Sequence, residues 1–301
     1  MVFRRAIMQG NFDSVLEPAQ PGRTAKLTIR LKVALLPRDP SVAANPRAGQ
    51  HPTHLANNMT QVRRGSVPDA NGDPVACRSW LVHEWNAFKI QFKRIVEQTW
   101  DNQMILLPPD GTEDGLNDND FLQLIGNPRI PAHVECALDI ELMPGTAGSH
   151  AQIGVVHLAS PDLSFRNFMH LISNDSAEMG SRVKDQWPGR RIYHVTAAHE
   201  VGHWLRDPSA KLYEHIDRAY AETLPADEQD DAQYGHVLSK RLAIMGSGNL
   251  ATEYEAQPWL GRIRRHTGAL FGWSMVHRAN FAHMISTVSG RQQRLAQQPR
   301  I

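Results

Sequence analysis

The sequence lacks the long apolar runs and the one-sided charge that mark membrane-spanning and nucleic-acid-binding proteins. Its longest apolar stretches, such as residues 33–36, are only a few residues long, whereas a transmembrane helix needs about 20. The chain has 32 Lys and Arg against 31 Asp and Glu, a formal net charge of +1, so it has no global basic field. We therefore expect neither a nucleic acid nor a membrane as partner.

Cysteine is also scarce, with Cys77 and Cys136 as the two copies in 301 residues. No CxxC pair is present, which excludes a zinc ribbon built from thiolates. The pair could form a disulfide, remain as two buried thiols or contribute a metal ligand. Cys136 alternates with apolar residues in 134–142, so we expect it to be a small core residue.

The start of the chain has basic residues but no apolar segment after them, and Asn11-Phe-Asp13 follows instead. This pattern predicts no Sec signal peptide. Two locations remain open: the cytoplasm, or export by a route that uses no such peptide.

Strands and helices are predicted in mixed order, which favours an α+β fold. Alternating apolar residues predict strands at 26–33, 134–142 and 152–158, and a short apolar run predicts another at 104–107. Aromatic and aliphatic residues at helical spacing predict a helix over 85–99 and packing helices over 266–285, while the acidic stretch 110–120 is expected to be a solvated loop rather than a calcium site. We expect a β-containing region at 1–75 and a main domain at 76–301.

One short motif has chemical content: His199-Glu200-Val-Gly-His203, within the proline-free segment 192–205. On a helix, residues i and i+4 lie one turn apart on the same face, so both imidazoles can reach one ion. Glu200 then projects beside the ion, where it can take a proton from a zinc-bound water. The motif predicts Zn²⁺ bound by His199 and His203, with Glu200 as general base.

A catalytic zinc site needs a third protein ligand and one open coordination position. Glu222 follows His203 after eighteen intervening residues, on a predicted helix over 211–222, at the spacing expected of a zinc peptidase with a glutamate ligand. His236 lies in the segment Gln233-Tyr-Gly-His236, just before 243–249. The remaining candidates are Asp207, His215, Glu253 and Glu255.

The HExGH motif, the Tyr-Gly-His segment and the following Ile244-Met245-Gly-Ser-Gly together resemble the metzincin clan of zinc metallopeptidases. The resemblance covers residues 192–249 and extends weakly upstream. It implies that a turn at Met245 underlies the zinc site. It also implies a mixed sheet with the active-site helix in an upper subdomain at 76–206, and a mainly helical lower subdomain at 207–301.

The third metzincin ligand usually lies six residues after the second histidine, where this chain has Ser209, and Arg206 stands in place of the usual glycine. An insertion after the active-site helix restores the pattern. The resemblance then implies His236 as third ligand, nine residues before Met245. Some bacterial toxin-like metallopeptidases carry a similar turn, which also implies an effector role.

The function predicted from these patterns is a zinc-dependent endopeptidase with a metzincin-like α+β fold and a polypeptide substrate. Zinc, held by His199, His203 and His236, and Glu200 would together activate the attacking water. Two alternatives remain open: a noncatalytic binding or structural module whose zinc only stabilises the fold, and a zinc hydrolase acting on a non-peptide bond.

Overall fold

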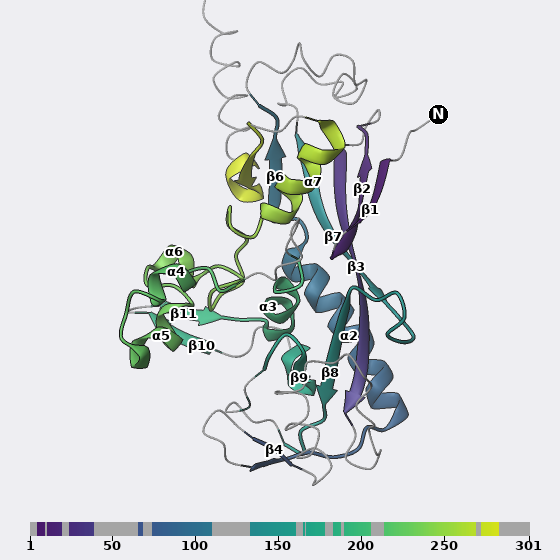
Figure 1. Ribbon diagram of the computed structural model, residues 1–301, viewed down its shortest axis with the longest axis vertical. Coiled ribbons are helices and arrows are strands. Elements are labelled where there is room, and N and C mark those ends of the chain that lie inside the picture. The colour runs from purple at the N-terminus through teal and green to yellow at the C-terminus, as the bar shows by residue number, and fades with distance from the viewer. Residues whose placement is uncertain are drawn as a thin grey trace, which may run out of the picture. The chain divides into compact units, whose positions relative to one another are not determined.

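The computed structural model shows an α+β fold in which helices and strands do not alternate strictly, as expected (Figure 1). The residues that the structure describes are 5–9, 11–19, 24–38, 66–68, 74–109, 133–160, 165, 167–177, 183–187, 190–205, 214–268 and 272–282. The chain divides into two compact units, each assembled from separated stretches. One unit comprises Met1–Arg30, Trp100–Asp139 and Leu205–Ile301, and the other Leu31–Thr99 and Ile140–Trp204. The expected division at residue 75 stays a prediction.

The first unit contains antiparallel strand pairs. Strand β2 (Phe12–Glu17) pairs with β1 (Arg5–Gln9) and with the start of β3 (Ala25–Arg38). Strand β6 (Met104–Leu107) pairs with β7 (Val134–Leu142) and with β12 (Ser274–His277). The predicted strands at 26–33, 104–107 and 134–142 are therefore confirmed. Most of the apolar side chains that predicted them, alternating in the first and third and continuous in the second, are buried in the core.

Helix α7 (Gln257–Thr267) packs against β2 in this unit (Figure 1). Its Trp259 is fully buried, stacks on Trp100 with ring centroids 5.8 Å apart, and donates its indole N–H to the Ala137 carbonyl at 3.1 Å. The unit also contains three short helices: α4 (Arg218–Ala221), α5 (Ala226–Ala232) and α6 (Leu238–Arg241). The contacts of Trp259 with Trp100 and Ala137 join residues far apart in the sequence, so long-range contacts determine much of the structure of this unit.

Two helical predictions are wrong in part. Helix α7 ends at Thr267 with Gly268 as its C-cap, and residues 274–277, expected to be helical, form β12 beside β6. In the predicted helix 211–222, residues 214–217 are not helical, and helix α4 covers only 218–221. Here the Ile216 and Asp217 amides donate to the Met245 and Gln233 carbonyls instead, so tertiary hydrogen bonds override local helix propensity.

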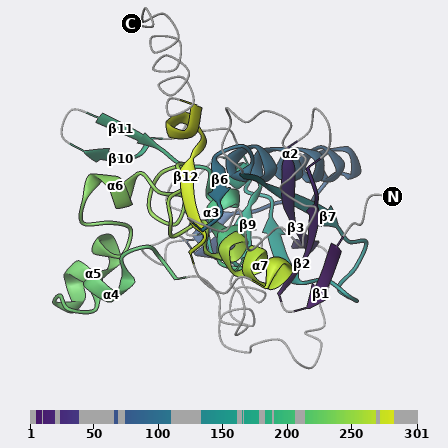
Figure 2. The same ribbon diagram turned by 90° about the horizontal axis from the view of Figure 1, so that it is seen from above.

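The second unit contains parallel pairs. Strand β8 (Ala151–Val156) lies between the end of β3 and β9 (Leu171–Ser173) and is parallel to both. This strand confirms the prediction at 152–158, although it ends two residues earlier. The unit further contains the 3₁₀ helix η1 (Asn174–Ala177), the pair β4 (Ser66–Pro68) and β5 (Pro74–Ala76), and the two-stranded ribbon β10 (Val183–Trp187) and β11 (Arg190–Tyr193) (Figure 2).

Helix α2 (Val82–Trp100) buries the apolar face predicted for it, including Phe88, Phe92 and Ile95. A polar pair on the helix binds one residue of β7. Lys93 Nζ donates to the Ile140 carbonyl at 2.6 Å, and Glu97 Oε1 accepts the Ile140 N–H at 2.8 Å. The helix is therefore held by apolar burial and by two hydrogen bonds to the backbone of a strand.

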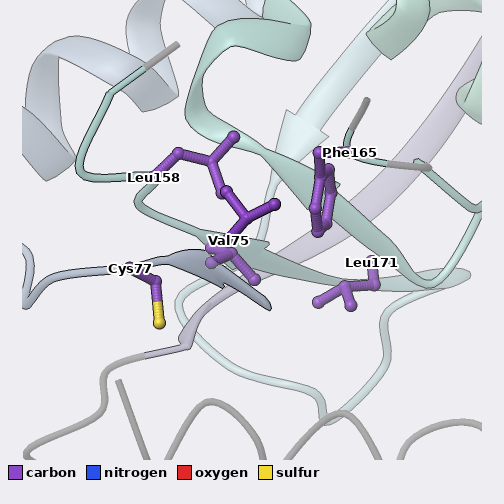
Figure 3. Close-up of a cluster of buried hydrophobic side chains, with 6 residues drawn as sticks. Val75, Cys77, Leu158, Phe165 and Leu171 are labelled. Carbon is purple, nitrogen blue, oxygen red and sulfur yellow. The ribbon is translucent and has the colours of Figure 1, made fainter. Parts of the chain in front are cut away.

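A smaller apolar cluster in the second unit packs β5 against β8 and β9, and Figure 3 shows its side chains. It consists of Val75, Cys77, Val156, Leu158, Phe165 and Leu171. Both cysteines are free, so the disulfide alternative is not observed. The expectation for Cys136 is confirmed: it is buried, and burial raises the pKa of its thiol well above the usual range.

In the part of the chain that the structure describes, no helix has the length and apolar character needed to cross a membrane. The acidic stretch 110–120 and the candidate ligand Asp207 lie outside the described residues.

Truncation of Phe92 to alanine should destabilise the protein, because its ring is fully buried on the apolar face of α2. Phe92→Ala is expected to lower the free energy of unfolding by about 3–5 kcal/mol. The matched control is Ile90→Ala on the same helix. The Ile90 side chain is 70% exposed, so this substitution should change the free energy of unfolding by no more than about 0.5 kcal/mol. Urea unfolding measures both, and equal effects would contradict the assigned helix face.

Candidate metal centre

The predicted helix around the HExxH motif is present as α3 (Thr196–Gly202), which follows β11. Ala197, Ala198 and Val201 are fully buried, because the helix packs this small apolar face inward. His199 and Glu200 are also buried, and His203 directly follows the helix as its C-cap. The local pattern therefore produced the helix and placed both motif histidines one turn apart.

Aromatic and hydrogen-bonding contacts fix α3 at both ends. The His194 ring, buried just before the helix, lies 5.0 Å from the His199 ring, measured between centroids. At the other end, Trp204 donates its indole N–H to the Met169 carbonyl at 2.9 Å. The His199 and His203 rings are 5.1 Å apart and nearly perpendicular, so each presents its edge in a defined direction.

His215 completes a group of three histidines with His199 and His203. One ligand atom of each lies within 4.8 Å of the others, and His199 is buried while the other two are half-buried. Three imidazole nitrogens form a ligand set that Zn²⁺ uses in catalytic sites and that suits other divalent transition metals. The described residues therefore provide a group that could hold a metal ion.

A hydrogen bond to Gln233 fixes the ring of His215. Its Nδ1 lies 2.7 Å from Gln233 Oε1, and Gln233 Nε2 donates to the Asp230 carbonyl at 3.1 Å and to its Oδ1 at 3.0 Å. These donor bonds orient the amide so that its oxygen accepts the Nδ1 proton of His215. Nε2 is then the nitrogen that His215 would offer to an ion, the usual arrangement of a supported histidine ligand.

His236, the third ligand implied by the resemblance, is hydrogen-bonded to Asp217. Its backbone N–H donates to Asp217 Oδ2 at 2.9 Å, its ring Nδ1 bonds to the same oxygen, and the Tyr220 ring stacks on it. Lys240 Nζ donates to Asp217 Oδ1 at 2.5 Å. Burial raises the pKa of Asp217, but the hydrogen bonds from Lys240 and His236 outweigh this and hold it below its usual range.

The close group among the described residues contains His215, which was an alternative, and leaves out His236. A ligand role for His236 stays a prediction. Glu222 is exposed and pairs with Arg218 at 3.0 Å, and Glu253 is also exposed. Glu255 is fully buried and accepts hydrogen bonds from backbone amides.

Met245 lies fully buried in the tight turn of residues 243–248. The Gly246 and Gly248 amides both donate to the Ala243 carbonyl at 3.0 Å. A Cβ on Gly246 would lie 2.3 Å from the Lys240 carbonyl oxygen, and one on Gly248 would lie 2.1 Å from that of Leu242, so the turn requires both glycines. The Met245 carbonyl accepts the Ile216 N–H at 3.1 Å, which connects the turn to the neighbour of His215.

Sequence reasoning missed the supporting residues Gln233 and His194. Gln233 belongs to the Gln-Tyr-Gly-His segment, which drew attention only for its histidine. His194 lies five residues before His199, outside the motif. Neither has a spacing signal, because each contacts a histidine of the candidate group in a way that depends on the fold.

Replacement of His215 by alanine should remove the third ligand of the group. Wild-type protein dialysed against zinc is expected to retain about one equivalent per chain, and His215→Ala to retain far less. His236→Ala is the matched control and should retain the wild-type amount. Elemental analysis after dialysis measures all three, and the reverse pattern would assign the third ligand to His236.

Comparison of the chain with protein-family models, curated proteins and solved structures finds no match in any of the three.

Proposed function

We propose that the protein is a zinc-dependent endopeptidase. The observation that carries this proposal is the group formed by His199, His203 and His215, with Glu200 directly after the first ligand. Three histidines leave a coordination position of a tetrahedral zinc for water or substrate. A site that only stabilised the fold would instead close around four protein ligands.

The residues fit zinc through their donor chemistry. Imidazole nitrogen is a preferred zinc ligand, and the Gln233 amide holds His215 in the tautomer that would direct Nε2 to the ion. When bound, zinc polarises a substrate carbonyl and lowers the pKa of water. Both effects, on the carbonyl and on the water, would come from the ion itself and require no further side chain of the proposed site.

Glu200 has the acid–base role in this proposal. It is buried on α3 directly after His199, so the helix fixes its backbone next to that of the first proposed ligand. Glu200 takes a proton from the attacking water and then returns it to the leaving amine. The residue that moves the proton therefore lies on the same helix as His199, and His203 follows that helix directly.

The metzincin resemblance supports peptide bonds as the substrate class. With His215 as third ligand, the chain keeps the order of the clan: motif helix, third ligand, buried methionine turn. The third ligand lies twelve residues after His203 rather than six, so a shorter insertion is needed than for His236. The contact from Met245 to Ile216 supports a turn that lies next to the third ligand.

Glu200→Gln should abolish hydrolysis while leaving the zinc content unchanged. The amide keeps the size of the side chain but cannot take up the proton, so casein hydrolysis is expected to fall by about 10²–10⁴-fold. Protease assays and elemental analysis on the same preparations measure the two effects.

Glu222→Gln, which changes an exposed acid on α4, is the matched control and should keep full activity. Full activity of Glu200→Gln would contradict the mechanism. Wild-type protein that binds zinc but cleaves no peptide would instead favour the structural alternative, and Glu200-dependent cleavage of another bond would favour the non-peptide hydrolase.

A further inference from the structure

A buried carboxylate, Glu255, lies at the centre of the hydrogen bonds that hold the Met245 turn. It is fully buried, and its Oε1 accepts the Met245 N–H at 2.9 Å. Its Oε2 accepts the Thr252 N–H at 2.8 Å and the Thr252 hydroxyl. Burial of a carboxylate is costly unless donors compensate it, and here both oxygens are used to hold backbone groups.

The turn that Glu255 holds continues directly to the third histidine. The Met245 amide donates to Glu255, and the Met245 carbonyl accepts the N–H of Ile216, next to His215. On the other side of His215, the Tyr254 hydroxyl donates to the Glu214 carbonyl at 2.9 Å. The backbone is therefore held immediately before and after His215 by Tyr254 and, through Met245, by Glu255.

Gln103 holds the far side of the same loop. Its Nε2 donates to the Asn249 carbonyl at 2.9 Å and its Oε1 accepts the Ala251 N–H at 2.8 Å. The segment from Met245 to Glu255 is thus fixed at its start, its middle and its end. A rigid segment of this kind can determine where a neighbouring ligand lies.

We infer that Glu255 is a positioning residue for the metal site and acts on His215 through the Met245 turn, with Tyr254 as its companion. The inference rests on the proposed function, because it concerns a ligand of the same site. Only a carboxylate offers two acceptor oxygens and no donor. Glutamine at this position would direct an N–H₂ group at one of the amides that Glu255 now accepts.

The experiment measures zinc affinity by competition with a chromophoric chelator. Outer residues that orient ligands typically contribute 10–100-fold in metal affinity, so Glu255→Gln is expected to bind zinc about 10–100-fold more weakly than wild type. Tyr254→Phe removes one hydroxyl from the same support and should weaken binding by a smaller factor. Glu253→Gln, an exposed acid in the same loop, is the matched control and should bind like wild type.

A double-mutant cycle separates positioning from a general structural role. Because Glu255 acts through His215, Glu255→Gln should cause no further loss of affinity in a His215→Ala background. An equal loss in both backgrounds would overturn the inference, as would wild-type affinity in both Glu255→Gln and Tyr254→Phe. If Glu255→Gln fails to fold by far-UV circular dichroism, Tyr254→Phe and its cycle with His215→Ala decide.

The failure of this inference is distinct from the failure of the proposed function. Wild-type protein that binds no zinc contradicts both. Wild-type protein that binds zinc and cleaves peptides, with unchanged affinity in the Glu255 and Tyr254 variants, contradicts only the role of Glu255. A loss of affinity in those variants without peptidase activity in wild type supports the positioning role and contradicts the endopeptidase.

Discussion

A metal ion held by three imidazoles requires that all three rings point at one position, and an imidazole rotates about two side-chain torsions unless its surroundings stop it. The three histidines of the candidate group are restrained in two different ways. His199 and His203 obtain their direction from a helix, and His215 obtains its direction from a network of hydrogen bonds. The candidate centre depends on both, because two ligands on one helix do not form a catalytic zinc site by themselves.

The helix has little stability of its own. Seven residues are too few for an isolated helix in water, so α3 persists because Ala197 and Val201 are fully buried and because Trp204 is hydrogen-bonded to the Met169 carbonyl. His215 does not lie in a helix. Its ring is hydrogen-bonded to Gln233, and its neighbours Glu214 and Ile216 are hydrogen-bonded to Tyr254 and to the Met245 carbonyl. Each such bond contributes about 0.5–1.5 kcal/mol, so several are needed to hold one ring.

This difference explains what the sequence could predict. The spacing of His199 and His203 was sufficient because helix geometry is local, and the strands at 26–33 and 134–142 followed from equally local alternation. The support of His215 comes from Gln233, 18 positions further along the chain, and from Tyr254, which lies 40 positions after the Glu214 carbonyl that it contacts. Hydrophobic periodicity gives no signal for such contacts. Other long-range bonds, from the Ile216 and Asp217 amides to the Met245 and Gln233 carbonyls, made the predicted helix over 211–222 wrong at residues 214–217.

The segment Gln233-Tyr-Gly-His236 resembled a ligand-bearing segment, and the structure gives it a definite part beside the candidate centre. Its first residue accepts the Nδ1 proton of His215 through the side chain and the Asp217 N–H through the backbone carbonyl. Its last residue donates its backbone N–H to the Asp217 carboxylate. The loop 215–217 is thus held by this segment at both ends and by the Met245 carbonyl in between. A histidine of the candidate group and a histidine hydrogen-bonded to a residue near that group can therefore produce the same sequence pattern, and the atoms around each ring distinguish the two arrangements.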